Sequence, residues 1–198
     1  MKNIRRYLVF LLGLVFFGFG ISLGIKSGFG NNPMGVFVQG MTVLTSLSLG
    51  TCNLISGLFQ TVIGYVLEKK NVSIATFLVI FFGSFFIDLA NAVIPDSDVF
   101  IVRVMYMLAG ILVYCLAFSL QQIAKCGLSN YDCFIFGLSK LFKTDNYPLI
   151  RGICDLSFIV LGYLLGGVVG PVTPVMFLFS GKIIVFFRKH LQRLEESL

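Results

Sequence analysis

The chain alternates long apolar segments with short polar or charged breaks, and six of the apolar segments are long enough to cross a bilayer. They cover residues 6–26, 51–68, 73–94, 101–124, 148–167 and 171–187. A membrane-spanning helix needs about 20 predominantly apolar residues, and tilt absorbs modest differences in length. The pattern therefore predicts an all-α fold, a polytopic helical bundle in a membrane.

Two further apolar segments are shorter, at residues 33–47 and 131–143. The second carries Lys140 and Lys143, so it is too short and too charged to cross a membrane easily. From the pattern alone, each short segment is a re-entrant helix, an interfacial helix or a true span.

The composition supports a membrane protein and excludes several other classes. Of the 198 residues, 57% are hydrophobic and 12% are charged, whereas a soluble domain carries about 25% charged residues. The first span is too long for a signal peptide and has no cleavage site after it. Five cysteines without a C-x-x-C pair, and one histidine in the basic tail, predict neither a metal site nor a cofactor.

Basic residues indicate the orientation of the spans. With six spans, 13 of the 15 Lys and Arg residues lie on one side, and only Lys26 and Arg103 lie on the other. With eight spans the division becomes 11 to 4. The positive-inside rule therefore favours six spans in the cell membrane, with both termini and residues 69–70 cytoplasmic and residues 96–98 outside. The net charge of +6 is explained by these flanks and predicts no nucleic-acid partner.

The two halves of the chain align with each other. Identical residues 97 apart are Gly13/Gly110, Ser22/Ser119, Leu23/Leu120, Gly30/Gly127, Phe37/Phe134, Gly40/Gly137 and Leu44/Leu141. Identical residues 98 apart are Leu58/Leu156, Gly64/Gly162, Tyr65/Tyr163 and Gly83/Gly181. Three spans in each half make the second half enter from the opposite side, so we expect a 3+3 inverted repeat. The single membrane domain covers 1–198, with repeats at 6–94 and 101–187 and a basic tail at 188–198.

A glycine-rich break precedes each short segment, in the stretches GFGNNPMGVFVQG and CGLSNYDCFIFGL. In the first stretch Asn32 can cap a helix that begins at Pro33, because proline loses no hydrogen bond at that position. In the second, Ser129 or Asn130 can cap, and Asp132 falls in the first turn, where a carboxylate is favourable. Such helix starts can hold a polar or anionic solute if they lie at membrane depth, and are only turns if they lie at the surface.

Several ionisable residues lie inside the predicted spans, where they are costly and mark candidate sites. Asp88 and Asn91 share a face of the third span, and Arg151 and Asp155 are four residues apart on the fifth. Two interpretations of this pair stay open, a binding site and a neutralised arginine near the end of the helix. The residues proposed to bind a solute are Gly30, Asn32, Pro33, Asp88, Gly127, Asn130, Asp132, Arg151 and Asp155.

The paired glycine motifs give the chain a resemblance to the bacterial YczE/YyaS/YitT-type membrane proteins. That family has G-x-x-P-W-D followed by G-L, and Gly30, Pro33 and Gly40 match it in the first copy. In the second copy Gly127, Asp132, Gly137 and Leu138 match. Met34 and Gly35 replace Trp and Asp, so only Asp132 can supply the acidic residue of the motif. The resemblance implies a multi-pass bacterial membrane protein and no particular activity.

Three functions fit these features. The inverted repeat and broken helices favour a small transporter or permease of an unidentified small-molecule solute. Glycine faces at intervals of four, such as Gly20, Gly24 and Gly28, suit helix packing or a homo-oligomer, and with the basic tail they allow a non-transporting regulator of a partner protein. A substrate-capture subunit of a vitamin importer has a similar size. The chain shows no H-E-x-x-H, G-x-S-x-G or P-loop motif, so we do not expect an enzyme.

Overall fold

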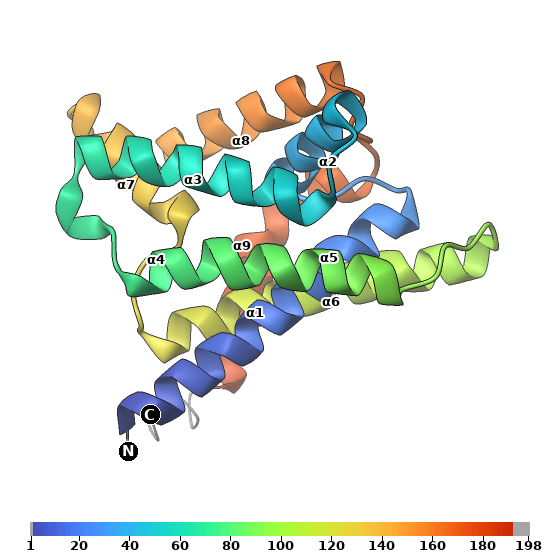
Figure 1. Ribbon diagram of the computed structural model, residues 1–198, viewed down its shortest axis with the longest axis horizontal. Helices are drawn as coiled ribbons and strands as arrows, with labels where there is room; N and C mark the ends of the chain where they lie inside the picture. The colour runs from blue at the N-terminus through green and yellow to red at the C-terminus, as the bar shows by residue number, and fades with distance from the viewer. Residues whose placement is uncertain (1, 192–198) are drawn as a thin grey trace.

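The computed structural model describes residues 2–191, and the regular elements in that part of the chain are all helical (Figure 1). In chain order they are α1 (Lys2–Ser27), α2 (Pro33–Thr45), α3 (Leu49–Leu67), η1 (Lys69–Asn71), α4 (Ile74–Leu78), η2 (Val79–Gly83), α5 (Ser84–Val93), α6 (Phe100–Ala124), α7 (Asn130–Leu141), α8 (Tyr147–Leu164) and α9 (Val172–His190). Residues 192–198, which hold most of the predicted basic tail, lie outside the described residues.

Elements α4, η2 and α5 follow one another without a break and form one long helix over residues 74–93. The middle element, η2, is a π-turn, in which the hydrogen bonds reach one residue further than in an α-helix. This helix is the third predicted span, and the π-turn was not foreseen from its sequence.

Five helical stretches among residues 2–191 are long and apolar enough to cross a membrane: Ile4–Ser27, Leu49–Leu67, Ile74–Val93, Phe100–Ala124 and Tyr147–Leu164. They coincide with the first five predicted spans. Helix α9 is not among them; it carries Lys182, Arg188 and Lys189 in its second half, so the sixth span stays a prediction. The fold is that of a helical membrane bundle.

The surface of the bundle is unusually apolar, as a lipid-facing surface should be. Phe59, Val66 and Phe85 expose 66%, 71% and 59% of their surface, whereas Gln60, one residue from Phe59 on α3, exposes 1%. These large apolar side chains thus face outward, and a neighbouring polar one faces inward. This arrangement indicates contact with a bilayer, because water would favour the reverse.

The helices meet through glycines. Helix α1 lies along α6, α2 packs on α8, and α3 packs on α7. A Cβ atom at Gly20 would lie 2.7 Å from the backbone nitrogen of Tyr114 on α6, and one at Gly162 would lie 2.6 Å from the nitrogen of Phe37 on α2. The glycine faces predicted from sequence therefore serve close packing inside the chain.

Gly162→Ala is expected to destabilise the protein because the added methyl group would force α8 away from the backbone of α2. Overpacking of this kind costs about 1–3 kcal/mol. Gly152→Ala on the same helix is the matched control, since no described atom lies within 4 Å of its Cβ position. Melting temperatures in detergent should fall for Gly162→Ala only; equal melting temperatures would contradict the close packing of α2 on α8.

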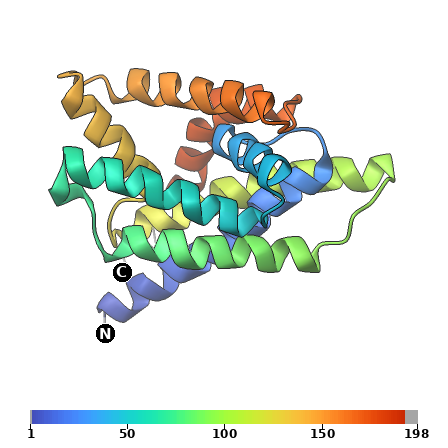
Figure 2. The same cartoon turned by 45° about the horizontal axis from the view of Figure 1, so that its top comes forward.

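The two short helices begin inside the molecule and end at its surface. Asn31 and Asn32, which precede α2, are each 3% exposed, whereas Leu44 at its end is 67% exposed. In α7, Cys133 and Ile135 are fully buried, and the lysine-bearing end is exposed. Figures 1 and 2 show α7 and α2 near opposite ends of the layer formed by α3 and α8. Both short helices are thus built into the bundle at their first turns.

Five lysines gather at one end of the bundle. The basic end holds Lys69, Lys70, Lys125, Lys140 and Lys143. The far end holds the turns at 46–48, 94–99 and 165–171 (Figure 1). At the basic end Lys140 Nζ lies 2.7 Å from Glu68 Oε2, which joins α7 to α3. The hydrogen bond from Lys140 holds the pKa of the Glu68 carboxyl below its usual value.

Candidate functional site

The first glycine motif is a closed turn. Asn32 caps α2 by accepting a hydrogen bond from the Gly35 amide at 2.9 Å, and Pro33 takes the first helical position, as predicted. Asn31 donates to the Ile21 carbonyl of α1 at 3.0 Å and accepts from the Asn32 amide at 2.8 Å. Gly30 adopts φ 91°, a conformation that suits glycine. The polar groups of this motif are thus occupied by bonds within the protein.

The second glycine motif is also a helix start, and Ser129 is its cap. The Ser129 hydroxyl accepts from the Asp132 amide at 3.1 Å and donates to Asp132 Oδ2 at 2.8 Å. Asn130, the other candidate cap, is the first residue of α7 and donates to Gln60 Oε1 of α3 at 2.7 Å. Both copies therefore begin helices, but only the second places a carboxylate there.

Helix α8 brings three polar side chains to α7. Tyr147, Arg151 and Asp155 are four residues apart, so they lie along one face of the helix. Asn146 caps this helix by accepting from the Leu149 amide at 3.2 Å, and Pro148 lies in its first turn. The face carrying the three side chains meets the first turn of α7.

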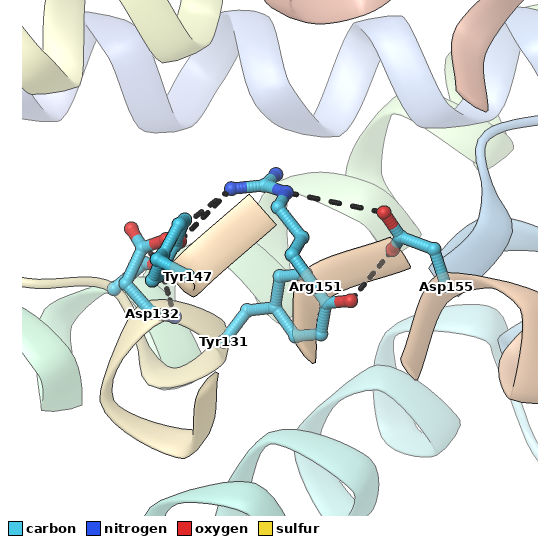
Figure 3. A network of polar contacts seen from close by, with 6 residues as sticks. Tyr131, Asp132, Tyr147, Arg151 and Asp155 are labelled. Carbon is cyan, nitrogen blue, oxygen red and sulfur yellow. Dashed lines mark hydrogen bonds and ion pairs between the residues drawn. The ribbon is translucent and has the colours of Figure 1, made fainter. Parts of the chain in front are cut away.

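The side chains of α7 and α8 form a charged network (Figure 3). The Tyr147 hydroxyl donates to Asp132 Oδ1 at 2.7 Å, and the Tyr131 hydroxyl donates to Asp155 Oδ1 at 2.6 Å. Arg151 lies between the two carboxylates, with Nη1 3.5 Å from Asp132 Oδ1 and Nε 3.9 Å from Asp155 Oδ2. Each carboxylate is thus held firmly by a tyrosine and loosely by the shared arginine.

The guanidinium of Arg151 keeps one edge available. Its Nη1 also donates to the Tyr147 hydroxyl at 3.1 Å, and its carbon lies 5.3 Å from the centre of the Tyr131 ring. The third nitrogen, Nη2, makes no hydrogen bond with the described residues and points away from both carboxylates in Figure 3. Every buried side-chain nitrogen or oxygen within residues 2–191 has a hydrogen-bond partner. Because Nη2 has none, it is not buried and is accessible.

The network lines a cavity of about 530 Å³ between α6, α7, α8 and α9. Its charged wall consists of Asp132, Arg151 and Asp155, with Gln122 nearby, and α9 supplies an apolar wall that includes Phe177 and Ile184. A second cavity, of about 390 Å³, shares Phe118, Gln122 and Asp132 and reaches Lys125 and Arg188 near the basic end. Asp132 therefore faces both spaces.

The predicted site residues fall into separate places. Asp132, Arg151 and Asp155 come together in the network, with Asn130 beside it, and Gly127 lines the smaller cavity. Gly30, Asn32 and Pro33 form the closed turn before α2. Asp88 lies elsewhere: its carboxylate accepts from the Ser48 hydroxyl at 2.7 Å and from the Gly50 amide at 2.6 Å, at the start of α3.

Sequence reasoning missed the two tyrosines of the network and Gln122. Tyr147 lies four residues before Arg151, and Tyr131 lies next to Asp132, so helical spacing from the charged residues was the available signal. Gln122 lies near the end of the fourth predicted span, and its position there carried no specific signal.

Residues 4–189 match DUF6198, a family of unknown function, and the chain belongs to that family. An uncharacterized protein of Haemophilus influenzae is 26% identical over 186 residues, which cover 94% of this chain and 84% of the relative. No solved structure matches the chain. The expected resemblance holds at the level of an uncharacterised family, and nothing in the comparisons supports the narrower YczE/YyaS/YitT name.

Proposed function

We propose that this DUF6198 protein is a permease of the cell membrane that carries a small charged or polar solute past Asp132, Arg151 and Asp155. The observation that carries the proposal is that these three ionisable side chains line a cavity of about 530 Å³ in a bundle of membrane type. Ionisable residues at membrane depth are expensive, and they commonly mark a solute or ion pathway.

The bonding of the network suits exchange with a solute. The contacts of Arg151 with the carboxylates, at 3.5 and 3.9 Å, are longer than a charge-assisted hydrogen bond of about 2.7–2.9 Å. A carboxylate or phosphate group of a solute can bind Nη2 without displacing either aspartate. An ammonium group or a proton can instead bind Asp132 or Asp155, which the tyrosines keep in position.

The contacts between the helices support an inverted repeat. The Ser22 hydroxyl of α1 donates to the Ile87 carbonyl of α5, and the Ser119 hydroxyl of α6 donates to the Ile184 carbonyl of α9, both at 3.0 Å. Each member of the second pair lies 97 residues after its counterpart. In the two halves α2 corresponds to α7 and α3 corresponds to α8, and α2 packs on α8 as α7 packs on α3. A two-fold axis that relates the halves would produce these matching contacts.

Cytoplasmic orientation of the basic end forms part of the proposal. The 13-to-2 division of basic residues supports it through the positive-inside rule. The cavities would then reach Asp132 from the cytoplasmic half of the membrane. Solute would leave or enter the network from that side.

The regulatory alternative draws less support. Its main feature was the set of glycine faces, and Gly20 and Gly24 are occupied by α6 and by Asn31 within the same chain. The tail that would contact a partner lies largely outside the described residues.

Solute binding and uptake test the proposal. Purified protein in nanodiscs is screened by thermal shift against amino acids, carboxylic acids, amines and sugars, and any stabilising compound is then tested as a radiolabelled solute in proteoliposomes. We expect at least one charged compound to raise the melting temperature and to accumulate in the vesicles. Asp132→Asn should reduce both effects about tenfold or more, because it removes a charge that faces the solute.

Asp145→Asn is the matched control, since Asp145 is an exposed carboxylate in the loop before α8. It should behave like the wild type. Uptake that Asp132→Asn and Asp145→Asn leave equally unchanged would rule out the network as the solute site, and no uptake of any stabilising compound would rule out the permease.

A further inference from the structure

The contacts of α5 and α9 differ in one respect. Helix α5 packs on α1 much as α9 packs on α6, with the matching serine bonds to Ile87 and Ile184. Helix α5 also packs closely on α3, whereas α9 has no comparable contact with α8 among the described residues. The contact of α5 with α1 therefore has a counterpart in the second half, whereas the contact of α5 with α3 has none of comparable extent.

The contact between α3 and α5 is polar and tight. Asp88 of α5 accepts from the Ser48 hydroxyl and the Gly50 amide, at 2.7 and 2.6 Å. One turn earlier on α5, Ser84 accepts from Asn53 Nδ2 at 2.9 Å. A side chain at Gly50 would collide with the Ser84 carbonyl and the Asp88 carboxylate, so the two helices touch directly.

The corresponding space between α8 and α9 is open. Gly152 of α8 and Gly181 of α9 have no atom of the described chain within 4 Å of their Cβ positions, and both line the cavity of about 530 Å³. The opening extends from Pro148, at the basic end of α8, to Val185 on α9. The α3–α5 pair is therefore closed at the far end, while the α8–α9 pair is open and its opening reaches the basic end.

We infer that Asp88 is the latch of a gate between α3 and α5, and that the structure is the state in which this gate is closed while the α8–α9 side is open. The gate rests on the proposed function, since a permease must expose its site to each side in turn. Opening it would break the bonds from Asp88 to Ser48 and Gly50 and give the far end a path toward Asn53 and Gln60. Closing α9 on α8 would close the path from the basic end.

Site-specific thiol labelling tests the latch without a known solute. The reporters are Ser84→Cys, at a position 3% exposed in the α3–α5 contact, and Gly152→Cys, on the open cavity. Each is combined with Asp88→Ala in the full chain in nanodiscs, where a water-soluble maleimide reaches both ends. Mass spectrometry measures labelling at each site, so the native cysteines remain.

Asp88→Ala should raise the labelling rate at the Ser84→Cys thiol about tenfold, because hydrogen bonds to a charged group are lost from the closed state. It should lower the rate at the Gly152→Cys thiol. Asp98→Ala, which removes an exposed carboxylate at the same end, should change neither rate.

A rise at both reporters would mean that Asp88 only holds the bundle together, and no change at the Ser84→Cys thiol in a folded variant would mean that it is no latch. Either result overturns the gate. Reciprocal labelling changes in a protein that takes up no solute would instead sustain the gate and reject the permease.

Discussion

Arg151→Met is expected to lower the free energy of unfolding by about 2–3 kcal/mol, since it leaves Asp132 and Asp155 without their shared cation in an apolar bundle. Losing one partner of a buried ion pair costs about 3–5 kcal/mol. We expect less here because 36% of the Arg151 side chain is exposed to the cavity. Unfolding of the purified protein by SDS in mixed micelles measures the change.

Two further variants separate charge from packing. Lys189→Met removes one positive charge from an exposed position on α9 and should leave stability unchanged within about 0.5 kcal/mol. Adding Asp132→Asn and Asp155→Asn to Arg151→Met removes the unpaired charges and should restore at least half of the loss, because a network replaced as a whole costs little. Failure of the triple variant to recover would show that Arg151 acts through its packing.

Phenylalanine at either open glycine of the cavity is expected to reduce solute uptake strongly while the protein stays folded. Gly152→Phe and Gly181→Phe place a ring where no described atom lies within 4 Å, in a space of about 530 Å³. Helix propensity changes by less than about 1 kcal/mol in favour of the variants, so stability should not fall. We expect uptake of the solute found in the screen to drop by about tenfold or more, as for a pocket that loses its volume.

Leu156→Phe is the matched control, because Leu156 lies on the same helix and 56% of it is exposed on the outer surface. It should keep wild-type uptake. Normal uptake by both glycine variants would remove the cavity from the transport path.

The sequence predicted those features that depend on residues within a single helix. Asn32 and Pro33 predicted the start of α2 because capping depends on residues three positions apart. The pairing of Arg151 with Asp155 followed from helical spacing. The apolar runs predicted six spans, and five of them are helices long and apolar enough to cross a membrane. The sixth, α9, is not among these five.

Features that depend on contacts between distant segments were not predictable. The sequence made Asp88 a candidate solute-binding residue. Its actual partners, Ser48 and Gly50, lie 40 and 38 residues away along the chain, so no local pattern revealed them. The cavity beside Gly152 and Gly181 arises because α8 and α9 stay apart, which no local pattern encodes. Hydrogen bonds from Tyr131 and Tyr147 to the carboxylates likewise require α7 to meet α8.

The π-turn at residues 79–83 also bears on the history of the chain. Before it, Gly64 and Gly162 are 98 residues apart; after it, Ile87 and Ile184, which accept the matching serine bonds, are 97 apart. Helix α9, which is described from end to end, has no such turn. Under the proposed duplication, a single residue gained by the first half was absorbed as a bulge, which kept the later contacts with α1 in register. Relatives that lack this residue should carry an unbroken α-helix there and the same separation between their halves just before and just after it.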